Sequence, residues 1–404
     1  MKVLKLSTLL CLAFSSLVFA NDNNTTLNSY LSNLKRKQFE YDNSKNEVDS
    51  SKLRDSWIAP LKLNYSYSRS KPFTRELTSQ SAAIRIDQPI FESGGIYYGI
   101  KFANASRLYS HYTIEVAKRK MIKDTISILM QIKQTALKIE VQKLQIKKSE
   151  INLTQKKEQY LNGQLDSGFL DNAIIQRNKV IQALYDIETR KEKLLNQFSA
   201  LSDLDVKTAR IPYLELIDQE EFLTHNIVLK QKNAEIKKSE YKKDVTAVKY
   251  LPKISFTAGY SWNKSQQQFS TTALFTKNIK YYDYGIRINM PIDLNTFRDI
   301  ESAKIDFLKS QVIIKDKQRE FKALFKQVMQ NINNFKKKKN LSLENKGIYT
   351  KILKETRKLF KAGYKTDYDV SLLENSVAIS SINYEIFEID EQLELLTLYE
   401  MYKK

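Results

Sequence analysis

The chain has 404 residues and a formal net charge of +20, from 66 lysines and arginines against 46 aspartates and glutamates. It has one cysteine, two histidines and nine glycines, with no H-E-x-x-H spacing and no glycine-rich phosphate loop. This composition argues against an enzyme, and we predict no catalytic, cofactor-binding or metal-binding residues.

The first 20 residues, MKVLKLSTLLCLAFSSLVFA, have the pattern of a secretory signal peptide. Two lysines precede an apolar run, and Val18-Phe19-Ala20 precedes polar Asn21. Cys11 lies inside this leader, and Leu10 before it is not the small residue that a lipoprotein signal needs. The mature chain is therefore predicted to be exported and to contain no thiol. Export argues against a nucleic-acid partner, so the lysines are interpreted as solvated helix faces.

The remaining chain is predicted to form two similar halves, residues 21–210 and 211–404. Each half begins with a polar helix, near 27–57 in the first half and 219–250 in the second. Each then continues with two strands, a proline crossover, a long helix, a glycine turn and a return helix. This order, found twice, predicts an internal structural repeat.

Four short stretches alternate between apolar and polar residues, as strands with two different faces do. They are residues 61–68, 82–89, 254–263 and 282–291. At about ten residues each they suit the staves of an outer-membrane β-barrel, although a half-buried sheet in a soluble domain shows the same alternation. After the leader, no apolar run reaches the roughly 18 residues of a spanning helix, so any membrane crossing must use strands.

Four strands are too few to close a barrel, since the smallest membrane barrels use about eight. An open strand edge in lipid leaves backbone groups without partners. Several copies of the chain must then share one barrel. On the polar faces, Arg85, Asp87 and Arg287 are expected to line a water-filled lumen, where simple hydration is the alternative role.

The proline-free regions 92–211 and 292–404 are rich in Lys, Glu, Gln, Leu and Ile, which favours long helices. One apolar stripe recurs every seven residues, and a second stripe lies five positions away, about 140° around a helix. The first stripe contains Ile132, Ile139, Ile146, Leu153 and Tyr160, and the second Leu137, Leu144 and Ile151. Two separate stripes predict a helix with a neighbour on each side, as in the wall of a helical cylinder, whereas a globular bundle more often shows one broad apolar face.

Two glycine turns interrupt these helices. Gly163 and Gly363 are predicted to end a helix at C′, where a left-handed backbone costs glycine little. Asp166 and Thr366 then cap the next helices, and Thr366 with Asp369 has capping-box spacing. We expect the turns to be the tips of two long helical hairpins.

These features together resemble one known family. The stretches that carry the resemblance are YLPKISFTAGYSW, DQPIFESGG, NMPIDLNTFRD and the second turn, GYKTDYDV. In that turn Gly363, Thr366, Asp369 and Val370 match the pattern Gly-x-x-Ser/Thr-x-x-Asp-Val, while the first turn matches only through its cap. The chain resembles the TolC-type outer membrane efflux proteins. This resemblance implies a homotrimer with a twelve-stranded barrel in outer-membrane lipid and a long periplasmic α-barrel. It also implies docking to a periplasmic adaptor and an inner-membrane pump.

The resemblance further implies roles for the hairpin tips. The tip turns, with Gly163, Asp166, Gly363 and Thr366, would contact the adaptor. Asp369 would narrow the periplasmic entrance as a gate, helped by Asp367, because Leu372 occupies the family's other gate position. The alternative role for Asp369 is a carboxylate favoured at a helix start.

Three functions remain open at this point. The first is the outer membrane duct of a tripartite efflux system. The second is the same duct serving type I protein secretion with an ABC exporter. The third, of a different class, is an exported coiled-coil structural or adaptor protein without a barrel.

Overall fold

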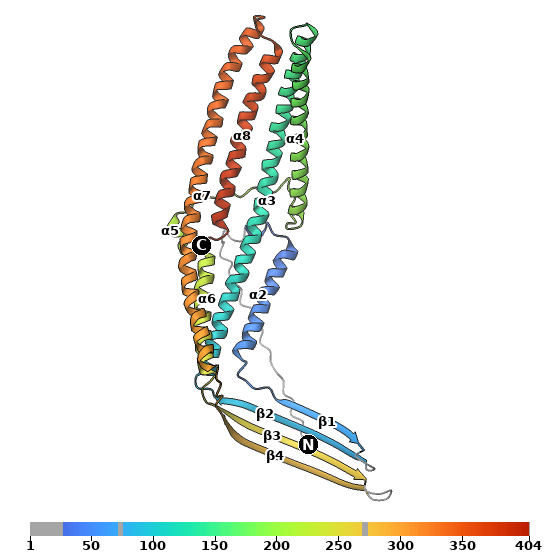
Figure 1. The fold of residues 1–404 in the computed structure, drawn as a ribbon, viewed down its shortest axis with the longest axis vertical. Coiled ribbons are helices and arrows are strands. Elements are labelled where there is room, and N and C mark those ends of the chain that lie inside the picture. The colour runs from blue at the N-terminus through green and yellow to red at the C-terminus, as the bar shows by residue number, and fades with distance from the viewer. Residues whose placement is uncertain (1–26, 72–75, 269–273, 404) are drawn as a thin grey trace, which may run out of the picture.

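A computed structural model describes residues 27–71, 76–268 and 274–403, and Figure 1 shows a sheet at one end and helical hairpins at the other. The signal peptide predicted for residues 1–20 lies outside the described residues. The elements of the first half are α2 (Asn33–Arg54), β1 (Lys62–Ser70), β2 (Leu77–Phe91), α3 (Gly95–Leu161) and α4 (Ser167–Ser199). Those of the second half are α5 (Gln219–Thr224), α6 (Ile227–Val248), β3 (Lys253–Gln268), β4 (Leu274–Asn289), α7 (Thr296–Lys361) and α8 (Asp367–Tyr399).

The helix expected over 219–250 is not continuous, and this prediction was wrong. Asn226 separates α5 from α6, because its Oδ1 accepts hydrogen bonds from the backbone N–H groups of Val228 (2.9 Å) and Leu229 (3.1 Å). Asn226 also forms an antiparallel bridge with Tyr402. An Asn side chain that caps the next helix ends the preceding one, so the chain turns there.

The four strands form one antiparallel sheet in the order β1-β2-β3-β4. Apart from β1, the strands are longer than expected, with 15 residues in β2 and 16 in both β3 and β4. Most of the added residues lie toward the strand ends farther from the helices, where the strict alternation disappears. There Ser and Gln occupy both faces of β2 and β3, and Phe275 and Ile279 of β4 lie on the face opposite to the apolar set. In the register, Ile84 pairs with Tyr260 and Phe256 with Ile286, so the predicted apolar sets share one face of the sheet.

Two long helices run the length of the helical part. The helix α3 has 67 residues and α7 has 66, whereas the return helices α4 and α8 have 33 each. Beside the tips, α3 packs between α4 and α8, and α8 packs on α7. Nearer the sheet, α3 packs against α2 and α6, and α6 against α7. A helix on each side of α3 agrees with the two apolar stripes in its sequence.

Backbone hydrogen bonds join the helices beside the tips (the upper level) to the helices nearer the sheet (the lower level). The Ser32 N–H donates to the Leu201 carbonyl at 2.9 Å, so α2 begins where the chain leaves α4. The Ile227 N–H donates to the Met401 carbonyl at 2.8 Å, so α6 begins where the chain leaves α8. In the part of the chain that the structure describes, four helices are therefore present at each level, and only α3 and α7 are continuous through both.

The main hydrophobic core lies at the level of these contacts. Phe222 of α5 is fully buried, with its ring centroid 6.4 Å from Phe321 and 5.9 Å from Phe325 of α7. Leu398 of α8 and Ile126 of α3 are also fully buried in this cluster. The core therefore ties both hairpins together midway between the tips and the sheet. Among the described residues, no helix is both long enough and apolar enough to cross a bilayer.

Candidate functional site: the sheet and the hairpin tips

One face of the sheet exposes large apolar side chains. On β4, Tyr284 is 75% exposed, Ile286 71% and Ile288 70%, and on β1 Leu63 is 74% exposed. Cross-strand pairing continues this surface through Ile84 and Tyr260 on β2 and β3. A contiguous exposed apolar patch of this kind marks a surface that contacts lipid or another protein.

The opposite face is polar and brings the predicted lumen residues together. Arg85, Asp87 and Arg287 all lie on it, and Arg287 Nη1 donates to Asp87 Oδ2 at 2.6 Å across the sheet. Lys62 lies on the same face directly opposite Arg85, a neighbour that the sequence did not reveal. The alternation in β1 places Lys62 on the polar face, but only the strand register identifies its partner.

The two edge strands are β1 and β4. Within the described residues, each pairs on one side only, so each presents a row of backbone N–H and C=O groups along its outer edge. Unpaired edges of long strands are sites for pairing with another chain.

Both glycine turns end their helices in the predicted way. Gly163 has φ of +70° and Gly363 of +81°, which is the left-handed region. At the first tip the Gly163 N–H donates to the Tyr160 carbonyl (2.9 Å) and the Gln164 N–H to the Gln159 carbonyl (2.8 Å). This pair of bonds defines a Schellman motif, and the same pair recurs around Gly363. The two tips thus have the same backbone design.

The caps of the return helices differ from each other. Thr366 and Asp369 form the predicted capping box, in which the Asp369 N–H donates to Thr366 Oγ1 at 3.2 Å and the Thr366 N–H donates to Asp369 Oδ2 at 3.0 Å. The hydrogen bonds from the Thr366 backbone and side chain lower the pKa of Asp369. Asp166 occupies the N-cap position of α4, but its side chain makes no capping hydrogen bond, so its predicted capping role was wrong in that respect. Asp166 cannot form a capping box, because the residue three positions later is Phe169 and not an acid.

Near the second tip a polar contact joins the two hairpins. The Tyr368 hydroxyl of α8 donates to Glu158 Oε1 of α3 at 3.0 Å, and this bond raises the pKa of Tyr368. Asp367, the first residue of α8, is exposed beside it. The sequence could not reveal this contact, because it joins residues 210 positions apart.

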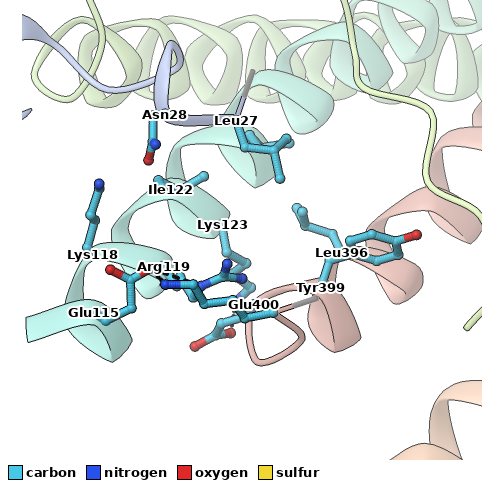
Figure 2. A pocket seen from close by; sticks show the side chains of 12 residues that line it. Leu27, Asn28, Glu115, Lys118, Arg119, Ile122, Lys123, Leu396, Tyr399 and Glu400 are labelled. Carbon is cyan, nitrogen blue, oxygen red and sulfur yellow. Dashed lines mark hydrogen bonds and ion pairs between the residues drawn. The ribbon is translucent and has the colours of Figure 1, made fainter. Parts of the chain in front are cut away.

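A pocket of about 200 Å³ lies where the end of α8 meets α3 (Figure 2). Burial alone would raise the pKa of Glu115 there, but Lys403 and Arg119, whose Nζ and Nε lie 3.2 and 3.3 Å from its Oε1, together lower it. Burial raises the pKa of Glu400, with Lys123 Nζ at 3.8 Å. These ion pairs hold the end of the chain against α3, which accounts for the charges in the pocket.

Comparison with solved structures shows which proteins share this fold. The outer membrane protein VceC of Vibrio cholerae aligns with a TM-score of 0.68 at 14% identity, over 94% of this chain and 96% of that one. The Campylobacter jejuni CmeC outer membrane channel aligns with a TM-score of 0.67 at 13% identity, over 97% and 91%. The open state of the Neisseria gonorrhoeae MtrE outer membrane channel aligns with a TM-score of 0.63 at 11% identity, over 93% and 87%. The fold, a sheet joined to long helical hairpins, is that of outer membrane channels.

A family model matches the sequence of the second half. Residues 220–394 match the model of the outer membrane efflux protein family. Comparison with curated protein sequences gives no match. The family match, together with the shared fold, confirms the resemblance to TolC-type outer membrane efflux proteins. Proteins of this family are channels and not enzymes.

Proposed function

We propose that this protein is the outer membrane channel-tunnel of a tripartite efflux system, passing substrates from an inner-membrane pump and a periplasmic adaptor to the exterior. One observation carries the proposal. The sheet has one exposed apolar face, one polar face and two unpaired edges, and two long hairpins continue from it. At 1.5 Å per residue, a 67-residue helix extends about 100 Å, long enough to reach well into the periplasm.

Closure of the sheet requires more than one copy. Pairing of β1 in one copy with β4 in the next would satisfy both edges, which lipid requires. Two copies would supply the minimum of about eight strands, and the family resemblance favours three copies and a twelve-stranded barrel. In this arrangement Arg85, Asp87 and Arg287 face the water-filled lumen, and the two halves of each chain act as structural repeats around the wall.

The hairpin tips are proposed as the adaptor contact and the gate. Both Schellman turns are exposed, and Tyr364 beside Gly363 is 80% exposed. These turns, with Asp166 and Thr366, offer a surface for the adaptor. Asp369 and Asp367 would form an acidic ring at the periplasmic entrance, with Asp369 keeping its role in the capping box.

Native mass measurement in mild detergent tests the proposal. We expect a closed oligomer, extracted from the outer membrane, whose migration changes on heating. A stable monomer would contradict the shared barrel, and release of the chain as a soluble periplasmic protein would favour a structural or adaptor role. In a deletion strain, we expect increased susceptibility to small toxic compounds with an unchanged set of secreted proteins.

A further inference from the structure

Two cations lie directly opposite each other on the polar face of the sheet. Lys62 of β1 pairs with Arg85 of β2, so their Cβ atoms are separated by only about 5 Å. Like charges at directly opposed positions destabilise a sheet. Stability of the fold therefore does not explain why both positions are basic.

The two acids of the strands on this face are placed differently. Asp87 accepts the hydrogen bond from Arg287. Asp283 lies in the same cross-strand row as Arg85, with Gly259 between them. The Asp283 carboxylate sits over Gly259, because a Cβ added to this glycine would meet Asp283 Oδ1 at 2.9 Å. The row therefore carries two adjacent cations and one acid on the side of Arg85, so each chain contributes a net positive charge to it.

The polar face as a whole carries a net positive charge. Its strand residues include five cations and two acids, namely Lys62, Arg85, Lys253, Lys277 and Arg287 against Asp87 and Asp283. The cation pair lies at the end of the sheet nearer the helices, where β1 begins (Figure 1). Between the charges the face carries small side chains, among them Ala83, Ser255 and Thr257, which leave room above the strands.

We propose that Lys62 and Arg85 form an anion-binding ring in the channel, so that the duct favours cargo bearing carboxylate or phosphate groups. The inference rests on the proposed function, because copies of the pair form a ring only when several chains close one barrel. In a narrow pore with low-dielectric walls, a ring of like charges attracts counter-ions and repels ions of its own sign. The mutual repulsion of the two cations is relieved when an anion binds between them.

Reversal-potential measurements with the purified oligomer in planar lipid bilayers, under a gradient of KCl, test the ring. We expect the wild-type channel to pass chloride in preference to potassium. The double variant Lys62→Gln with Arg85→Gln should lower the chloride-to-potassium permeability ratio by about twofold or more. Lys264→Gln, on the apolar face of the same sheet, should leave the ratio unchanged. Arg85→Lys should keep the preference because it keeps the charge.

The outcomes separate the two proposals. Conductance with a potassium preference in the wild type, or an unchanged ratio in the double variant, would overturn the anion ring and leave the channel intact. A wild-type oligomer that gives no conductance would overturn the proposed function together with the ring. The same measurements are repeated with Asp369→Asn added to the wild type and to each variant. This removes the proposed acidic entrance as the cause of any difference in the chloride-to-potassium permeability ratio.

Discussion

Two neighbouring residues of β3 test the assignment of the sheet faces. Phe256 lies on the apolar face, pairs with Ile286 and is 40% exposed in the single chain. Thr257 lies on the polar face, between Asp87 of β2 and Gly285 of β4. We expect Phe256→Arg to impair membrane assembly and Thr257→Arg to be tolerated, because the second arginine would face water and lie opposite a carboxylate.

The size of the effect follows from the position of Phe256 in the apolar band. On β3 this band runs from Ile254 to Trp262, with Ala258 at its centre. Phe256 is two residues from the centre, about 7 Å along the strand and about 5 Å in depth for a strand tilted by roughly 45°. The apolar band of such barrels is about 25 Å tall, so the arginine would lie well inside it and cost about 2–4 kcal/mol per chain. With a factor of ten for every 1.4 kcal/mol, assembly would weaken by about 30- to 700-fold per chain.

The assay is refolding from urea into phospholipid vesicles. The assembled fraction is read from heat-modifiable migration as a function of urea concentration. Phe256→Arg should assemble only at lower urea than the wild type, and Thr257→Arg should follow the wild-type curve. Equal loss in both variants would mean that the strand faces are assigned wrongly, and normal assembly of both would mean that this face does not contact lipid.

Other predictions concern the hairpin tips. Gly363→Ala, just beyond the end of α7, should cost about 1–2 kcal/mol because of its left-handed backbone. Gly347→Ala, inside α7, should instead stabilise that helix by about 0.5–1 kcal/mol. Hydrogen exchange along α7 that changes equally in both variants would refute this. Asp369→Asn should reduce block of single channels by divalent cations added from the periplasmic side, and a larger effect of Asp166→Asn would remove Asp369 from the proposed gate. The pKa of Asp369 is lowered in the folded chain, so its capping contribution to stability is complete above about pH 4 and is lost as the pH falls below that value. Below about pH 4, protection of the amides at the start of α8 from hydrogen exchange should therefore fall in the wild type but not in Asp369→Asn. Tyr368→Phe should loosen the contact between α3 and α8, seen as faster exchange at the tips of both helices, and unchanged exchange would show that its hydrogen bond to Glu158 contributes nothing.

Much of this fold could be predicted because its signals are local. A proline-free, helix-favouring composition predicted the long helices, and glycine at C′ predicted both turns, at Gly163 and Gly363. Alternation with a period of two predicted which strand residues share a face, as the pairing of Phe256 with Ile286 bears out. Each of these signals depends on residues within one or two turns of backbone.

The rest depends on partners that are distant in the sequence. The contact between Tyr368 and Glu158 requires α3 and α8 to be neighbours, which no spacing within either helix encodes. The pairing of Lys62 with Arg85 depends on the register of two strands, and a shift of one residue would separate them. Asn226 was expected inside a helix because its flanks are helix-favouring, but its side chain instead caps α6.

The way the upper and lower helices meet has a mechanical consequence. Within the described residues, four helices lie side by side both near the tips and near the sheet, yet only α3 and α7 cross the joint between these levels as unbroken covalent rods. The other two lines are continued by backbone hydrogen bonds, from Ser32 to Leu201 and from Ile227 to Met401, each contributing about 1 kcal/mol net. A torque applied at the tips therefore reaches the sheet through two covalent rods, and through hydrogen bonds and core contacts where the other two helix lines meet. Because the two junctions are not covalent and the core around them is made of packed side chains, the hairpins can shift there only by repacking that core.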